Sequence, residues 1–397
     1  MKDQRKFIHF HCFVFLFIIY PFTLSSTEYL TVGGEKYGWE VSVHPDRGTI
    51  KQFRQLMGDV WETIPFRDDS LAGPAWSGMQ LCPSKKQLYV FEAHQGDIYY
   101  TLRYKAAYDH LIVECTISNR GDDVFRPEYS RLFIGVDSEM KTYPDWDTKF
   151  FPTLLRCEKD FAWGYFMSPR QIIMGIGVEE PVASYTLNYV YEGSMEWKWG
   201  HQIKTGSLDL LHCLPLPERH PQNNLSLKPH ETRKWTLHLG VVDRLAGVKE
   251  KLSQWIQAPM IECEKYTMAG HETSRLLIHS QSGLEKLIVK APDGTQSVLP
   301  VDGVADNVYS ALFSPSSQKG LYRITATAIN GKTAEASIYI RNPWSWYMKN
   351  ARDFVARNPP LFSNGCEAFY GYYTAFLGAR HFPETSVDSI LEKRFNR

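Results

Sequence analysis

The sequence lacks an excess of either charge. Its 397 residues include 44 Lys and Arg against 44 Asp and Glu, so the formal net charge at pH 7 is zero. Proteins that bind nucleic acid through its phosphates carry a basic surface. The balance of charge therefore argues against nucleic acid as a partner.

Short catalytic signatures are also missing. The sequence has no GxSxG elbow, no HExxH zinc motif, no phosphate-binding loop and no complete dinucleotide fingerprint. Its seven cysteines include no CxxC pair and are widely spaced beyond Cys12. This excludes a disulfide-dense scaffold and predicts buried free thiols, with one bridge left open as an alternative. We expect no cofactor and no metal.

The apolar run near the start is too short to cross a membrane. The basic stretch "MKDQRK" precedes "FVFLFIIYPF", and small residues follow at Ser25, Ser26 and Thr27. This order is typical of a cleavable export signal, whereas a spanning helix needs about 20 apolar residues. No cysteine directly follows the run, so no lipoprotein anchor is expected. We predict that residues 1–27 are a signal peptide, that the protein is periplasmic or secreted, and that it keeps no stable membrane anchor.

Alternating patterns dominate the chain from residue 28 to about residue 242. In "DHLIVECTISN" every second residue from Leu111 to Ile117 is apolar, which is the period of a half-buried strand. Similar runs follow one another without the helices of βαβ units. "DRLAGVKEKLSQWIQAP" then indicates a helix. The pattern predicts one large antiparallel β-supersandwich over residues 28–256, ending in a linker helix.

A second β unit and a helical segment follow. Between residues 257 and 342, "KAPDGTQ" and "TAINGKTAE" are hairpin signals, and short strands predict an immunoglobulin-like (Ig-like) β-sandwich without its disulfide. From residue 343 the apolar period becomes helical, and one face that needs a partner surface carries Trp344, Tyr347, Met348, Ala351, Phe354 and Val355. Residues 343–397 are therefore predicted to begin a helical domain.

Carboxylates beside aromatic side chains are the residues best suited to sugar chemistry. A carboxylate can bond sugar hydroxyls or act as an acid or base, and a flat ring can stack on the apolar face of a sugar. The candidate catalytic residues are Glu367, Asp145 and His201. The candidate substrate-binding residues are Trp146, Trp197, Trp199 and Tyr370.

Several of these candidates also have a structural explanation. In a strand, Trp197 and Trp199 share one face, where they either stack on one ligand or pack together in the core. Glu367 begins a predicted helix, where the helix dipole alone favours a carboxylate. Glycoside hydrolysis needs two carboxyl groups at a defined separation, which a sequence does not reveal.

The order of these parts resembles a type of glycan-degrading enzyme. "GHQIKTGSLDLLHCLPLPERHPQ" and "SLKPHETRKWTLHLGVV" resemble the galactose-mutarotase-like β-supersandwich of enzymes from Gram-negative polysaccharide-utilisation systems. "NPWSWYMKNARDF" and "NGCEAFYGYYTAFLGARHFP" resemble the first helices of the (α/α) toroid that holds their active site. The suggested relatives are the β-glucuronidase-type hydrolases of glycoside hydrolase family 154. A complete toroid has many more helices, so the resemblance implies a truncated one here.

The resemblance implies the N-terminal region of a glycoside hydrolase that acts on a polysaccharide containing uronic acid. Such a fragment is inactive if its catalytic residues lie in the missing helices, and its aromatic stripes would then be exposed. A polysaccharide lyase is an alternative, although we expect lyase toroids to precede their β domains, which favours the hydrolase. Two further alternatives are a non-catalytic glycan-binding protein and a structural protein of the cell surface. The expected partner in the first three cases is a poly- or oligosaccharide.

Overall fold

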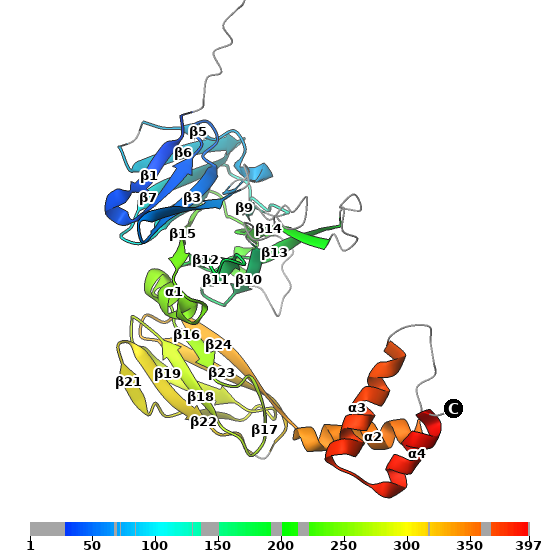
Figure 1. The fold of residues 1–397 in the computed structure, drawn as a ribbon. Coiled ribbons are helices and arrows are strands. Elements are labelled where there is room, and N and C mark those ends of the chain that lie inside the picture. Colours follow the sequence, from blue (N-terminus) through cyan, green and yellow to red (C-terminus); the bar gives the residue numbers. More distant parts are fainter. Residues whose placement is uncertain are drawn as a thin grey trace, which may run out of the picture.

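Two β-sandwiches and a small group of helices follow one another along the chain (Figure 1). The computed structural model describes residues 28–66, 70–71, 73–83, 85–128, 130–135, 151–191, 201–212, 222–316, 318–358 and 367–395. The predicted fold class, mainly β with antiparallel sheets, is confirmed. Among the described helices, none has the length and apolarity that crossing a membrane requires.

The first sandwich contains three described sheets. One has the strand order β1 (Leu30–Gly34), β2 (Trp39–Val43), β3 (Ile50–Met57) and β4 (Val60–Pro65). The largest has the order β10 (Phe151–Cys157), β11 (Ala162–Met167), β12 (Ile173–Val178), β15 (Thr232–Val242), β8 (Leu111–Asn119), β7 (Ile98–Ala106), β6 (Leu88–Gln95) and β5 (Gln80–Leu81). The third has the order β13 (Ser184–Tyr191), β14 (His201–Asp209) and β9 (Arg131–Ile134). All their pairings are antiparallel.

Strand β8 shows how the alternating sequence sets the packing. Its apolar residues from Leu111 to Ile117 are fully buried in the core of the first sandwich, and the residues between them are only partly buried. In the neighbouring strand β15, Leu237 pairs with Val113 and shares the same core. The opposite face of these strands therefore points away from that core, toward helix α1 and solvent.

The second sandwich packs two sheets against each other. One has the strand order β16 (Met260–Cys263), β18 (Ser274–His279), β22 (Val308–Phe313) and β21 (Gly303–Ala305). The other has the order β17 (Thr267–Ala269), β24 (Thr333–Arg341), β23 (Gly320–Ala328), β19 (Leu284–Lys290) and β20 (Gln296–Val298). The hairpin expected at "NG" joins β23 to β24, with Ala326 paired to Ala334. Strand β17 pairs with β24 in parallel.

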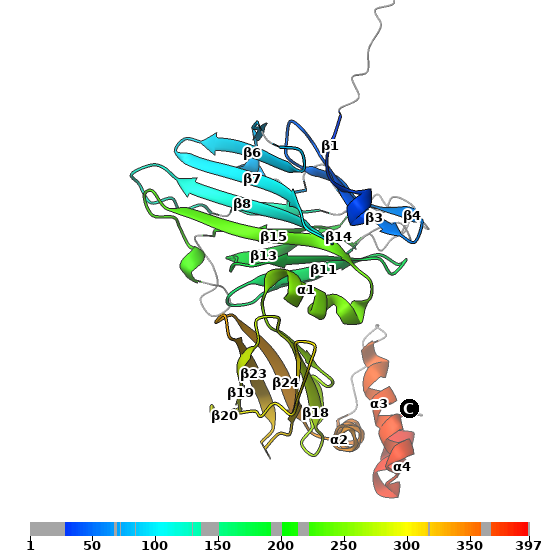
Figure 2. The same cartoon turned by 90° about the vertical axis from the view of Figure 1, so that its left-hand side faces the viewer.

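Helix α1 (Val248–Ile256) links the two sandwiches through a continuous core. Figure 2 shows it lying between the largest sheet and the second sandwich. Its side chains Leu252 and Trp255 belong to the same apolar cluster as Trp163 of β11 and Ile338 of β24. The domain boundaries at residues 256 and 342 stay predictions, and the described core does not divide at residue 256.

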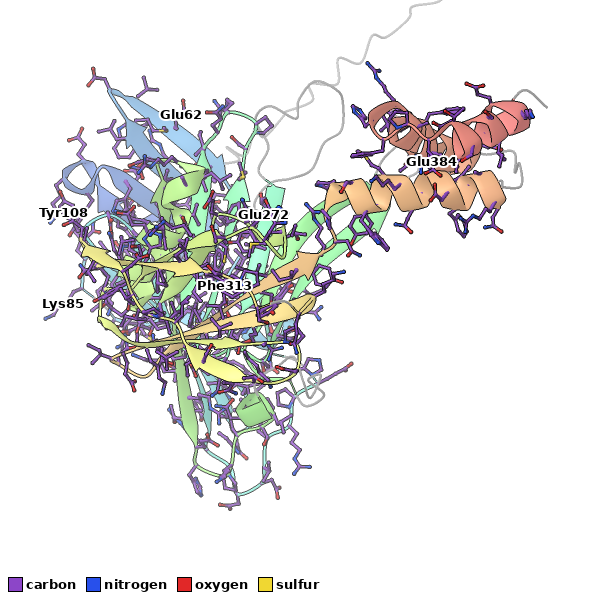
Figure 3. All side chains as sticks on the ribbon, turned by 90° about the horizontal axis from the view of Figure 1, so that it is seen from below. Glu62, Lys85, Tyr108, Glu272, Phe313 and Glu384 are labelled. Atoms are coloured by element: carbon purple, nitrogen blue, oxygen red, sulfur yellow. The ribbon has the colours of Figure 1, made fainter. Side chains whose placement is uncertain are left out.

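Helices α2 (Trp344–Arg357), α3 (Glu367–His381) and α4 (Thr385–Phe395) form a separate small cluster. Much of the apolar stripe predicted on α2 is exposed, because Trp344 and Phe354 are each 64% exposed. The helix buries Arg352, Val355 and Ala356, since α3 and α4 cover only one side of it (Figure 3). The toroid that these helices were expected to begin stays a prediction.

Candidate functional site

Four of the predicted site residues lie outside the described part of the chain. They are Asp145, Trp146, Trp197 and Trp199. The last two fall in the connection between β13 and β14, and the first two in the connection between β9 and β10. Their proposed roles stay predictions.

The other three predicted residues are placed by their backbone. His201 begins β14 and pairs with Tyr191 of β13. Glu367 begins α3, and Tyr370 lies in the first turn of that helix. The strand and the helix belong to different parts of the fold. The catalytic roles of His201 and Glu367 and the substrate-binding role of Tyr370 stay predictions.

The described structure brings together a different set of ionisable side chains. Four of them form one hydrogen-bonded chain, here called the histidine relay, which consists of Asp109, His110, His238 and Glu179. Asp109 Oδ1 lies 2.7 Å from His110 Nδ1, and His110 Nε2 lies 2.8 Å from His238 Nδ1. His238 Nε2 lies 2.8 Å from Glu179 Oε1. Lys251 of α1 lies 2.5 Å from the other oxygen of Asp109.

The fold explains why these residues meet. Asp109 and His110 lie between β7 and β8, His238 lies on the outer face of β15, and Glu179 directly follows β12. Trp255 of α1 stacks against His110 with ring centres 4.7 Å apart. The relay is therefore covered by α1 at the junction of the two sandwiches, and its two histidines are buried.

Neighbouring groups set the ionisation of the two carboxyl groups in the relay. Hydrogen bonds from His110 and the neighbouring Lys251 hold the pKa of Asp109 well below its usual value. Burial raises the pKa of Glu179, but the hydrogen bond and charge of His238 lower it overall. Both carboxylates are therefore ionised at neutral pH.

The surroundings of His110 favour its neutral form. Burial and the charge of His238 lower the pKa of His110, although Asp109 opposes this shift. A neutral His110 that donates from Nδ1 to Asp109 can accept at Nε2 from His238. The buried rings of the relay do not offer a polysaccharide a surface to bind.

Sequence reasoning missed this relay because its members are far apart in the chain. His110 and His238 are separated by 128 positions. Each lies in or beside an alternating strand, where the sequence alone does not distinguish a relay histidine from an ordinary core residue. The only local signal is the acid directly before His110 in "YDHL".

Cysteine and metal chemistry find no support in the described residues. Cys82, Cys115, Cys157 and Cys263 are free. Burial raises the pKa of Cys157 to about 12 and that of Cys263 to about 11, so neither forms a thiolate nucleophile at neutral pH. Within the described ranges, no group of three His, Cys, Asp or Glu is placed to hold a metal ion.

The second sandwich holds a cavity of about 520 Å³. Val289, Phe313 and Tyr322 supply apolar walls, and Gln318 donates a hydrogen bond of 3.0 Å to Asp293 at its rim. The volume lies in the range of small-ligand sites, roughly 300–1,000 Å³. Asp293 is the one acid among its described lining residues, so the cavity lacks the carboxyl pair of a glycosidase.

No protein-family model and no curated protein matches the chain. Among solved structures, its fold is similar to that of a polysaccharide lyase, with a TM-score of 0.63 and 14% identity. The alignment covers 91% of this chain and 60% of the lyase, so this chain spans about three fifths of the length of that protein. This likeness shows a shared fold, and the link to glycoside hydrolase family 154 stays a prediction.

Two smaller proteins align with part of the chain. A galactose mutarotase related enzyme from Lactobacillus acidophilus covers 54% of this chain and 98% of its own, with 6% identity and a TM-score of 0.33. A galactose mutarotase-like protein from Lactobacillus casei covers 54% and 100%, with 8% identity and a TM-score of 0.32. TM-scores this low support no conclusion about this chain.

Proposed function

We propose that this chain is part of an exported enzyme that degrades a polysaccharide containing uronic acid. The observation that carries the proposal is the fold shared with a polysaccharide lyase over 91% of the chain. The order of domains had favoured a hydrolase over a lyase. Because a lyase has this order of parts over most of the present chain, that argument no longer separates the two reactions.

A lyase reaction is the first candidate. A general base removes the proton next to the uronate carboxylate, the bond to the leaving sugar oxygen breaks, and a carbon–carbon double bond forms. The oxygen leaves with a proton as a new hydroxyl. His201 is the candidate base of this chain, with Trp197 and Trp199 as the proposed stacking surface for the sugar.

A hydrolase reaction is the second candidate, favoured by the sequence resemblance. One carboxyl group protonates the leaving oxygen, and the other carboxylate either attacks the sugar or activates water. Asp145 and Glu367 are the proposed acids of this chain. The two reactions use the same class of substrate but leave different products.

The products separate the two reactions in one assay. We would incubate the full chain with polygalacturonate, alginate, heparosan and chondroitin, and follow ultraviolet absorbance and new reducing ends together. A lyase yields both signals, because its double bond is conjugated with the carboxylate. A hydrolase yields reducing ends alone.

Variants assign the signal to the proposed residues. His201→Ala should abolish the lyase signal, whereas Asp145→Asn and Glu367→Gln should abolish the hydrolase signal. His230→Ala is the matched control, since His230 is an exposed histidine of the first sandwich that is not among the proposed residues. If the chain produces neither signal on any of these polymers, the proposal of an active degrading enzyme is wrong for this chain.

A further inference from the structure

Three aromatic side chains at the start of α2 are exposed in an unusual concentration. Trp344 is 64% exposed, Trp346 45% and Tyr347 36%. The ring centres of Trp344 and Tyr347 are 5.9 Å apart, and those of Trp346 and Tyr347 are 5.0 Å apart. These three residues are called the α2 aromatic cluster. Large exposed aromatic groups of this kind mark binding surfaces more often than chance.

Positive charge accompanies the cluster. The guanidinium of Arg341, the last residue of β24, lies 4.4 Å from the ring centre of Trp344. Lys319 hydrogen-bonds Asn342 next to it. The stretch from residue 341 to residue 352 contains no Asp or Glu. Two cations therefore flank the rings, and this segment contains no acidic residue that could pair with them.

The acidic residues nearest to Arg341 along the paired strands and along α2 already form ion pairs with other basic residues. They are Glu272, Glu335 and Asp353. Arg341 itself donates to the backbone oxygen of Asn342, and no carboxylate of the described residues pairs with its charge. This charge balance fits an anionic ligand better than a neutral one.

The chemistry of the surface identifies the class of ligand. Flat aromatic rings match the apolar face of a sugar ring, and a guanidinium matches a carboxylate through paired hydrogen bonds. A uronate sugar carries both features on one ring. A purely apolar partner would leave Arg341 without a counter-charge.

We propose that the α2 aromatic cluster and Arg341 form a binding subsite for a uronate-bearing oligosaccharide. The inference rests on the proposed function, because it names where that function holds its acidic substrate. The subsite lies at the junction of the second sandwich and α2.

The test measures binding of oligogalacturonate and of its methyl ester to the full chain by isothermal titration calorimetry. The ester keeps the sugar rings but removes their charge, so it should bind roughly ten-fold more weakly or worse. Trp344→Ala combined with Trp346→Ala should weaken binding of both ligands by about ten-fold or more. Arg341→Ala should weaken only the acid, and the two ligands should then bind alike.

Phe354→Ala is the matched control, because Phe354 is an equally exposed ring on α2, ten residues from Trp344. Unchanged binding in the Trp344 and Trp346 variant overturns the subsite, as does equal binding of acid and ester by the natural chain. The subsite is also overturned if the natural chain binds no sugar and analytical ultracentrifugation shows a dimer that the same variant converts to monomer. If the cluster binds the ligand but the chain cleaves no polymer, the proposed enzyme function is wrong and the subsite stands. If the chain cleaves a polymer but the Trp344 and Trp346 variant binds as tightly as the natural chain, the subsite is wrong and the enzyme function stands.

Discussion

Replacing His238 with leucine should destabilise the junction between the two sandwiches. The change leaves Nε2 of buried His110 without a partner and removes the ring nitrogen that faces Glu179. An unsatisfied buried polar group costs about 1–3 kcal/mol. Glu179 is 38% exposed and regains water, so it adds little. We therefore expect the single variant to lose about 2–3 kcal/mol, within the range for such groups.

The double variant His110→Leu with His238→Leu gives the sharper result. It removes both rings, and Asp109 keeps its ion pair with Lys251. Replacing a complete buried polar pair by apolar groups is often nearly neutral. The double variant should therefore be more stable than the sum of the two single variants predicts, by about 1 kcal/mol or more. Urea unfolding followed by tryptophan fluorescence measures all four proteins.

The pH dependence of the same proteins checks that folded His110 is held in its neutral form. The pKa of folded His110 is lowered from an unfolded value near 6.5, so its contribution to stability is complete above about pH 6.5. That contribution is lost as the pH falls through the lowered folded pKa. The double variant should lack this acid-side loss. Additive single variants, or identical acid profiles in the natural chain and the double variant, would refute the relay as described.

Three further predictions concern packing and processing. Gly177→Ala should cost about 1–3 kcal/mol of stability in the same urea assay, because its new Cβ would lie 2.4 Å from Cγ2 of Ile256 in α1. Gly175→Ala is the milder comparison and should cost less, because the nearest atom to its new Cβ would lie 3.1 Å away. Arg352→Ala should lower helical circular dichroism and cost the helical cluster about 1–3 kcal/mol, because buried Arg352 bonds Glu384 at 2.8 Å; an unchanged spectrum would contradict this. Expression in a Gram-negative host should yield a periplasmic or secreted protein whose first residue lies near position 28, and mass spectrometry that finds residues 1–27 still attached would contradict an export signal.

The sequence predicted local structure well wherever its period was decisive. Strand β8 and the hairpin at Asn330 and Gly331 follow directly from alternation and turn chemistry. For α2, the stripe shows which residues are apolar and not what covers them. Trp344 lies on that stripe and is exposed, whereas Val355 of the same stripe is buried with side chains of α3 and α4.

The candidate site was harder to predict for a different reason. A relay such as Asp109–His110–His238–Glu179 is made by strand pairing across more than a hundred residues, and no local motif records it. The catalytic candidates were chosen from local clusters of carboxylates and aromatics. Their value depends on distances between segments that a one-dimensional pattern does not contain.

The continuous core through α1 limits how the protein can be divided. Trp163, Leu252 and Ile338 belong to one apolar cluster, although they come from the first sandwich, the connecting helix and the second sandwich. A polypeptide ending at residue 256 would expose that cluster to water and would tend to aggregate. The two sandwiches should therefore be inherited, expressed and exchanged between proteins as a single piece, with the natural cutting point lying after β24 and before α2.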